Sequence, residues 1–166
     1  MSPRVVLVGP MGAGKSTVAG LLADAWGVPV RDTDADIVAT EGREISDIFV
    51  DSGEDHFRTL EAVAVAKALA EHDGVLALGG GAVLDAETRE LLADATVVFL
   101  KVGLSDAVKR VGLGVGRPLL LGNVRARIKA LLDERTPIYE SVATHTVDTD
   151  GRSPEDVAAE IRGLVA

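Results

Sequence analysis

Cysteine is absent from this chain of 166 residues, which excludes disulfide bonds and metal sites built from thiolates. Basic residues are also in the minority, since 17 Lys and Arg stand against 26 Asp and Glu, giving a formal net charge of −9. This balance argues against a general nucleic-acid binder, which needs a basic face. It leaves room for a small anionic ligand, because a local group of arginines can bind one whatever the net charge.

Long apolar runs are equally missing from the chain. No stretch approaches the roughly 20 residues that a membrane-spanning helix needs. The apolar run near the N-terminus ends on a glycine-rich loop and not on a small-residue cleavage site, so we expect no signal peptide, no membrane partner and a cytoplasmic protein. The chain also lacks repeats, linkers and a long apolar helix face, so we expect one domain over residues 1–166 and a monomer.

What the chain does contain is a regular alternation of short apolar runs and helical patterns. Strands are expected at residues 4–8, 28–31, 74–78, 96–102 and 145–147. Helices are expected at residues 16–26, 36–40, 45–50, 54–71, 85–93, 105–112, 124–141 and from 153 onward, with Asp85 and Ser105 as caps. Strands that alternate with helices indicate an α/β domain with a parallel sheet.

The stretch Gly9–Thr17, GPMGAGKST, matches the phosphate-loop pattern G-x-x-x-x-G-K-[ST] in full, between a strand pattern and a helical one. Glycines let successive backbone N–H groups turn toward phosphate oxygens, and the helix N-terminus adds positive potential. Lys15 is expected to reach the β- and γ-phosphates, and Ser16 to be a ligand of Mg²⁺ or Mn²⁺. The residues of the loop expected to bind ATP are Gly12, Ala13, Gly14, Lys15, Ser16 and Thr17.

Two aspartates, Asp32 and Asp34, follow the second expected strand, at the sheet edge where ligands gather in α/β domains. Because they are two residues apart, they share a face of extended backbone. One carboxylate can then approach the metal near Ser16, and the other can accept the proton of an attacking hydroxyl. Alternatively, one of the two simply caps the next helix.

Further motifs follow in order along the chain. They are G-x-x-I-x-x-I-F-x-x-x-G-E-x-x-F-R-x-x-E over residues 42–61, G-G-G at 79–81, R-P-L-L at 117–120 and R-T-P-I-Y at 135–139. Together with the phosphate loop and D-T-D at 32–34, this set resembles the shikimate kinase family over essentially the whole chain. Phosphate loops occur in very many proteins, so the specificity of the resemblance comes from the combination.

The resemblance implies a three-layer P-loop kinase fold, with a five-stranded parallel sheet flanked by helices and a mobile lid. The substrate-binding helices would lie at residues 33–61 and the lid at residues 112–123. The implied reaction is phosphorylation of the 3-hydroxyl of shikimate by ATP, which gives shikimate 3-phosphate for aromatic amino-acid synthesis. ATP would be the co-substrate and Mg²⁺ the cofactor.

The resemblance also assigns roles to single residues. Asp34 would bind the shikimate hydroxyls and activate the attacking one, and Asp32 would join Ser16 at the metal. An arginine fork suits a carboxylate, and Arg58 and Arg135 would hold that of shikimate. The remaining implied roles are a brace for Arg58 (Glu61), a catalytic contact with the transferring phosphoryl group alongside Lys15 and Asp34 (Arg117), and the border of the adenine (Arg110, Arg152, Pro154).

Three adjacent glycines, Gly79, Gly80 and Gly81, end the third expected strand at the same edge as the phosphate loop. Without side chains there, backbone N–H groups can approach the shikimate ring and its hydroxyls, and the resemblance places Gly80 in such a contact. A tight turn before Asp85 is the alternative reason for the glycines. Phe49 and Phe57 are expected either to wall the pocket or to pack in the core.

Two other functions compete with this interpretation. One is a different small-molecule P-loop kinase that acts on gluconate or a nucleoside monophosphate; the glycine triplet and the pair Arg58 and Arg135 favour a compact carboxylate instead. The other is a nucleotide-binding module without transfer chemistry. The intact set Lys15, Ser16, Asp32, Asp34 and Arg117 argues against such a module.

Overall fold

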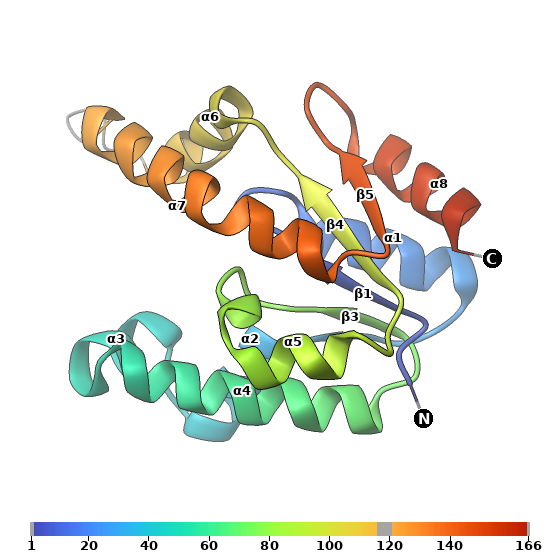
Figure 1. The fold of residues 1–166 in the computed structure, drawn as a ribbon, viewed down its shortest axis with the longest axis horizontal. Coiled ribbons are helices and arrows are strands. Elements are labelled where there is room, and N and C mark those ends of the chain that lie inside the picture. Colours follow the sequence, from blue (N-terminus) through green and yellow to red (C-terminus); the bar gives the residue numbers. More distant parts are fainter. Residues whose placement is uncertain (1, 116–120, 166) are drawn as a thin grey trace.

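The computed structural model describes residues 2–115 and 121–165, and for residues 111–115 and 121–123 it describes the backbone alone. Helices and strands alternate along the chain, as the sequence predicts (Figure 1). In chain order the elements are β1 (Val5–Val8), α1 (Lys15–Trp26), β2 (Val30–Asp32), α2 (Thr33–Glu41), α3 (Ile45–Ser52), α4 (Glu54–Glu71), β3 (Val75–Ala77), the 3₁₀ turn η1 (Ala82–Leu84), α5 (Ala86–Leu92), β4 (Val97–Lys101), α6 (Leu104–Val115), α7 (Leu121–Val142), β5 (His145–Asp148) and α8 (Pro154–Leu164).

Five strands form one parallel sheet in the spatial order β2-β3-β1-β4-β5. The central strand β1 is in register with both neighbours: Val6 pairs with Leu76 of β3 and with Val97 of β4. Because all strands are parallel, their carboxyl ends meet at one edge of the sheet, where ligands of such folds bind. The α/β class and the five-stranded parallel sheet are thereby confirmed.

Helices cover both faces of the sheet (Figure 1). On one face, Val5 and Leu7 of β1 belong to a core shared with α1 and α8. On the other face, Val6 and Val8 belong to a core shared with α4, α5 and α7. Every residue of β1 is therefore buried on one face or the other, which explains why its sequence is a continuous apolar run and not an alternating one.

A third, smaller cluster joins α2, α3 and α4 beside the β2 edge of the sheet. Its buried members are Ile37, Ile48 and Phe57, one from each helix. The cluster fixes the N-terminal turns of α2 and α4, which carry Asp34 and Arg58, relative to one another.

Three boundaries near the site differ from the sequence prediction. The helix α2 begins at Thr33 and not at residue 36, because the Asp32 side chain accepts a hydrogen bond from the Asp34 N–H and caps it. The helix α6 begins at Leu104, so Ser105 lies inside its first turn and is not its cap. Its backbone remains helical through Val115, whereas an irregular segment is expected from residue 112.

The remaining residues of the expected lid fall into two groups. Residues 121–123 begin α7 and are helical, and residues 116–120, with Arg117, lie outside the described residues. Within the part of the chain that is described, none of the helices combines the length and the hydropathy needed to cross a membrane.

Candidate functional site

The phosphate loop runs from the end of β1 to the start of α1 at the carboxyl edge of the sheet. Its backbone needs glycine at three points, one of which is Gly12 with φ 84°. Gly9 has φ 151°, and a Cβ there would lie 2.7 Å from the carbonyl oxygen of Leu100; Gly14, which precedes α1, is left-handed with φ 90°. No side chain caps α1, so the amides of its first turn remain open to an anion.

The Lys15 ammonium folds back over this loop. Its Nζ donates to the carbonyl oxygens of Gly9 and Pro10 at 2.6 and 3.0 Å. Burial lowers the pKa of Lys15 from its ordinary value of 10.5 to about 8, although the charges of Asp34 and Asp32 oppose this shift. The loop therefore holds a cation whose charged form is poorly solvated and gains strongly from an anionic ligand.

Ser16 and Asp32 meet beside the loop, as the sequence predicts. The Ser16 hydroxyl donates to Asp32 Oδ2 at 3.2 Å, while Asp32 Oδ1 accepts the Asp34 N–H at 2.8 Å. Asp32 therefore caps α2, which is the alternative that the sequence leaves open, and it contacts Ser16 at the same time. A hydroxyl and a carboxylate oxygen side by side are hard ligands of the kind that Mg²⁺ takes, alongside phosphate oxygens and water.

Asp34 occupies the centre of the charged site. Burial raises the pKa of Asp34 above its ordinary value, and the neighbouring charge of Asp32 adds to the rise, whereas Lys15 and Arg58 lower it. These neighbours come from the phosphate loop on one side and from α4 on the other. A carboxylate with a raised pKa between two cations is suited to accept a proton from a hydroxyl.

Arg58 and Glu61 form an ion pair on the first turns of α4. Arg58 Nη1 lies 2.7 Å from Glu61 Oε1, and Glu61 is only 3% exposed. Burial raises the pKa of Glu61, and the hydrogen bond and charge of Arg58 work against that rise, with Arg135 adding a smaller opposing effect. Glu61 therefore pairs with Arg58, a contact consistent with the brace that the resemblance implies, and Arg135 is close enough to act on the same carboxylate.

The two arginines share a feature that marks a ligand site. The Nε atoms of Arg58 and Arg135 are buried, and neither has a hydrogen-bond partner among the residues that the structure describes. Buried donors are almost always paired in native proteins, so these two call for an acceptor from outside the chain. A carboxylate suits a pair of arginines, because each guanidinium can donate hydrogen bonds to its two oxygens.

The glycine segment Gly79–Gly81 packs against these charged groups. A Cβ at Gly79 would lie 2.7 Å from Asp34 Oδ1 and 2.9 Å from Glu61 Oε2, and a Cβ at Gly81 would overlap the Arg58 guanidinium. None of the three has a positive φ. Space for the charged side chains, and not an unusual backbone conformation, therefore explains Gly79 and Gly81, whereas a Cβ at Gly80 would lie 3.7 Å or more from its neighbours. The 3₁₀ turn η1 follows the segment.

The structure supports core packing for the aromatic residues Phe49 and Phe57, one of the two roles that the sequence leaves open. Their ring centroids are 4.7 Å apart, and Phe57 is buried in the cluster with Ile37 and Ile48. The Arg58 guanidinium lies over both rings, 5.3 Å from the centroid of Phe57 and 6.0 Å from that of Phe49. The rings pack in the core and at the same time hold the arginine in place.

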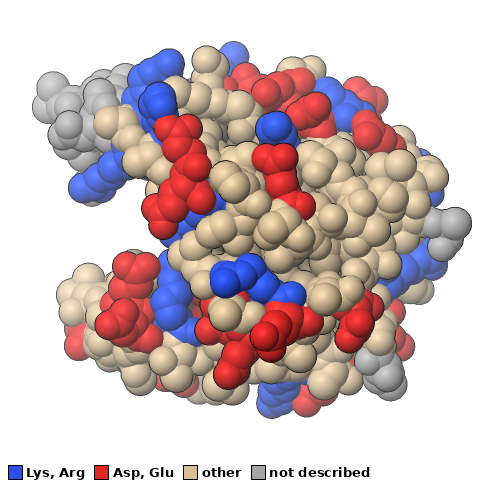
Figure 2. Space-filling model, in the orientation of Figure 1, with Lys and Arg blue, Asp and Glu red and all other residues tan. Residues whose placement is uncertain are grey.

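A cleft of about 330 Å³ brings the phosphate loop, the aspartates and the glycine segment together. Its lining includes Lys15, Ser16, Asp32, Asp34, Gly79 and Gly80, which lie far apart in the sequence. Figure 2 shows the molecule hollowed between α6 and α7 on one side and α3 and α4 on the other, with basic side chains at the inner walls.

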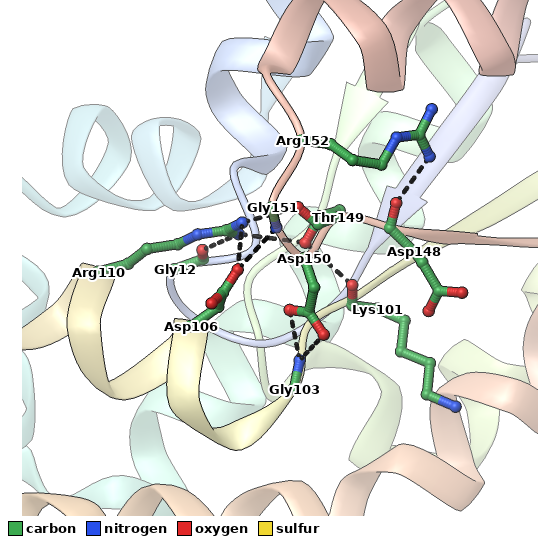
Figure 3. A network of polar contacts seen from close by, with 10 residues as sticks. All are labelled: Gly12, Lys101, Gly103, Asp106, Arg110, Asp148, Thr149, Asp150, Gly151 and Arg152. Carbon is green, nitrogen blue, oxygen red and sulfur yellow. Dashed lines mark hydrogen bonds and ion pairs between the residues drawn. The ribbon is translucent and has the colours of Figure 1, made fainter.

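Arg110 of α6, which the resemblance places at the adenine, forms a network of hydrogen bonds beside the phosphate loop (Figure 3). Its Nη1 donates to the carbonyl oxygen of Gly12 in the phosphate loop at 2.9 Å and to the Thr149 hydroxyl at 3.1 Å, and its Nη2 donates to the Thr149 carbonyl at 2.9 Å. These bonds occupy the edge of the guanidinium and leave its planar faces for stacking. A second cavity, of about 180 Å³, is lined by Arg110, Arg152 and Pro154 with residues of the phosphate loop.

Two aspartates that the sequence analysis missed support this arrangement (Figure 3). The Asp150 carboxylate accepts the Gly103 N–H, at 2.9 and 3.1 Å to its two oxygens, and Asp106 accepts the Gly151 N–H at 2.9 Å. The loops after β4 and β5 are thus linked reciprocally. No spacing in the sequence signals such a link, because each bond joins residues about 45 positions apart.

Comparisons with known proteins agree with this site. A family model described as "SKI: Shikimate kinase" matches residues 11–165. The chain is 60% identical to a shikimate kinase of Salinispora arenicola over 166 residues, which cover 100% of this chain and 99% of that protein. It is 59% identical to a shikimate kinase of Streptomyces coelicolor over 156 residues, 94% of this chain and 91% of that protein. Among solved structures, the shikimate kinase from Acinetobacter baumannii in complex with shikimate has a TM-score of 0.91 and 36% identity, covering 99% of this chain and 93% of that one.

Proposed function

The chain belongs to the shikimate kinase family, and from that premise we propose how its residues divide the work of the reaction. The chain is an enzyme with the activity of its family, the ATP-dependent phosphorylation of shikimate in the shikimate pathway. The geometry of the described residues supports a role for each part of the site except Arg117, whose role follows from the family resemblance.

The acceptor half of the site binds shikimate from the β2 and β3 side of the sheet. Arg58 and Arg135 hold the carboxylate through their buried Nε donors, and Glu61 keeps Arg58 in place. Asp34 accepts the proton of the 3-hydroxyl as that oxygen attacks the γ-phosphorus of ATP, and the bond from this phosphorus to the β,γ-bridging oxygen breaks to release ADP. The glycine segment offers backbone N–H groups to the other hydroxyls.

The nucleotide half of the site binds ATP from the β4 and β5 side. The amides of the phosphate loop and the Lys15 ammonium bind the phosphates, and Lys15 balances the charge that develops on the departing ADP. Arg110, Arg152 and Pro154 border the adenine. Arg117, whose position lies outside the described residues, is assigned to the transferring phosphoryl group within a lid at residues 112–123.

Ser16 and Asp32 are the residues that would hold Mg²⁺. The structure describes no cluster of three or more His, Asp or Glu side chains suited to a metal, so the remaining ligands would come from phosphate oxygens and water. When bound, the ion neutralises charge on the β- and γ-phosphates. In the folded chain Asp32 stays beside the Ser16 hydroxyl and also caps α2, so the ligand pair is fixed to the helix that carries Asp34.

Two wider properties belong to the same proposal. Residues 1–166 form a single kinase domain, with the substrate-binding helices at residues 33–61. The enzyme acts as a cytoplasmic monomer on ATP and shikimate, without nucleic-acid or membrane partners.

One observation carries the assignment of the acceptor: Asp34 lies where both the phosphate-loop cation Lys15 and the acceptor-side cation Arg58 act on its carboxyl group. Arg58 belongs with Arg135 to the pair whose buried Nε donors require an acceptor. A proton acceptor between an ATP site and a carboxylate site fits a small hydroxy acid such as shikimate better than a nucleotide, which lacks the carboxylate. It also gives the site transfer chemistry, which a simple nucleotide-binding module lacks.

Replacement of Asp34 tests this assignment. Asp34→Asn removes the proton acceptor but keeps the shape, so kcat for shikimate falls about 10²- to 10⁴-fold while the dissociation constant for ATP stays within twofold. ADP release is measured with shikimate, quinate, gluconate, AMP, CMP and no acceptor. Asp36→Asn, on the same helix and paired with Arg31, is the matched control and retains full turnover. Unchanged turnover in Asp34→Asn removes Asp34 from the mechanism.

A further inference from the structure

The carbonyl and amide groups of the glycine segment Gly79–Gly81 differ in their hydrogen bonding. All three carbonyls accept a hydrogen bond: those of Gly79 and Gly81 from amides of the 3₁₀ turn η1, each at 3.1 Å, and that of Gly80 from the Tyr139 hydroxyl at 2.6 Å. The three amides, by contrast, donate to no acceptor within residues 2–115 and 121–165. The segment therefore presents a row of unused donors, and Gly79 and Gly80 line the cleft beside Asp34.

Tyr139 controls the orientation of one of these donors. The carbonyl of Gly80 and the N–H of Gly81 belong to a single planar peptide group and point in opposite directions. A bond that fixes the carbonyl therefore fixes the direction of the N–H as well. The two flanking carbonyls are held by neighbours in the sequence, but this middle one is held by a side chain 59 residues away on α7.

The surroundings of the Tyr139 side chain stabilise this hydrogen bond. The residue is fully buried, and its ring stacks on Phe99 of β4 with centroids 5.0 Å apart, so the ring has little freedom to turn. Burial raises the pKa of the Tyr139 hydroxyl, against the smaller opposing effects of Arg135 and Arg58, so the group remains a donor. Arg135 precedes Tyr139 by one helical turn, so one face of α7 serves both the carboxylate site and the glycine segment.

We propose that Tyr139 is a positioning residue for shikimate. Through its hydrogen bond to the Gly80 carbonyl, it holds the Gly80–Gly81 peptide so that the Gly81 N–H is available to an acceptor oxygen beside Arg58. The oxygen belongs to shikimate, and this identification rests on the acceptor site proposed above. The competing role for the same hydroxyl is a purely structural one, the attachment of α7 to the loop before η1.

Tyr139→Phe separates the two roles, because it removes the hydroxyl and keeps the ring. A positioning role predicts that KM for shikimate rises about tenfold, the effect expected from the loss of one organising hydrogen bond, while KM for ATP stays within twofold. Thr144→Val is the matched control: it removes a hydroxyl that accepts the Val97 N–H at 3.0 Å between the end of α7 and β4, away from the site. The control leaves both KM values unchanged.

These kinetic measurements distinguish a failure of the positioning role of Tyr139 from a failure of the proposed acceptor site. If Tyr139→Phe keeps the wild-type KM for shikimate, or raises both KM values together with a large loss of thermal stability, the positioning role is wrong. Arg135→Lys is measured in parallel, since it should raise KM for shikimate if the carboxylate site is assigned correctly. An effect in Arg135→Lys without one in Tyr139→Phe contradicts only the inference, whereas no effect in either contradicts the acceptor site itself.

A measurement on the unmodified protein does not depend on the folding of any variant. In ¹⁵N-labelled enzyme, the Gly81 amide proton should exchange with solvent at least about tenfold more slowly when saturating shikimate is present than without ligand, because a bound oxygen then accepts it. A Gly81 exchange rate that shikimate leaves unchanged would overturn the proposal.

Discussion

At the scale of single residues, the site consists of charged groups that are withdrawn from water and control one another. Burial lowers the pKa of Lys15 and raises those of Asp34 and Glu61, while each cation partly reverses the shift of its acidic neighbour. Charged groups in such surroundings gain more from a ligand of opposite charge than they would on the surface. The binding of ATP and the ionisation of Lys15 should therefore be linked.

The affinity for ATP is expected to fall as the pH rises through about 8. In the free protein Lys15 loses its proton near that pH, and the phosphates of ATP raise its pKa in the complex. Above pH 8 binding therefore takes up a proton, and the dissociation constant rises by up to about tenfold per pH unit. Titration calorimetry in buffers of different ionisation enthalpy measures both the affinity and the proton uptake.

Lys15→Arg is the control for this pH dependence, because a guanidinium stays charged over the whole range. The variant should bind ATP with an affinity that does not change between about pH 7 and about pH 9. A flat profile in the wild-type protein would show that Lys15 keeps its charge and that its burial is without consequence for binding.

At the scale of elements, the start of α2 combines stability and ligand binding in one side chain. Asp32 ends β2, caps α2 through the Asp34 N–H and accepts the Ser16 hydroxyl. The helix that carries Asp34 is therefore tied to the helix that follows the phosphate loop. The cap and the proposed metal site make different chemical demands on Asp32, since the cap needs an oxygen and the metal site needs a charge.

Two substitutions of Asp32 should separate these tasks. Asparagine caps a helix as well as aspartate does, so Asp32→Asn should melt within about 2 °C of the wild-type protein while its KM for Mg·ATP rises about tenfold. Asp32→Ala should show the same kinetic loss and, in addition, lose about 1 kcal/mol of stability, or about 3 °C in melting temperature. Thermal unfolding and kinetics at several Mg²⁺ concentrations measure both effects. A normal KM in Asp32→Asn would leave Asp32 with the cap alone.

The elements themselves could be predicted from the sequence, whereas their precise starts and several contacts could not. The continuous apolar run of β1 and the phosphate-loop pattern each reflect local rules, and the structure confirms the strand and the helix that follows. The start of α2 was predicted three residues late, because the capping hydrogen bond of Asp32 competes with the extended conformation that D-T-D suggests. The contact from Arg110 to Gly12 spans 98 residues and has no periodic signature.

The glycine segment also shows how far a site can be predicted from the sequence. Its place at the site could be predicted, because a strand that ends at the ligand-binding edge is recognisable. Its reason could be predicted only in part, since the space is needed by Asp34, Glu61 and Arg58 as well as by a ligand. Only the assembled side chains reveal this requirement.

At the scale of the whole molecule, the protein is acidic, and Figure 2 shows both basic and acidic side chains around its hollow. The large apolar side chains that are exposed within the described residues are distributed over many elements, for example Val30, Val63, Leu91 and Leu164. Isolated apolar residues of this kind are normal for a monomer, and a stable dimer requires a contiguous patch.

Sedimentation velocity should therefore find a single species at the chain mass of 17.2 kDa. Because the net charge of −9 opposes association at low salt, the experiment is repeated at high ionic strength, where this repulsion is screened. The mass should not change. A species of twice this mass under either condition would contradict the monomer and would place an interface on a surface whose apolar residues are sparse.

The strand order β2-β3-β1-β4-β5 has a consequence for the evolution of the enzyme. In the proposed division of the site, the first half of the chain builds the acceptor side, apart from Arg135 and Tyr139 of α7, and the second half builds the adenine side around Arg110 and Arg152. Among the described residues, the phosphate loop lines the cavities of both sides. Evolution or protein engineering can therefore change the acceptor specificity through substitutions in one contiguous segment and on one face of α7. The residues of the nucleotide half need not change.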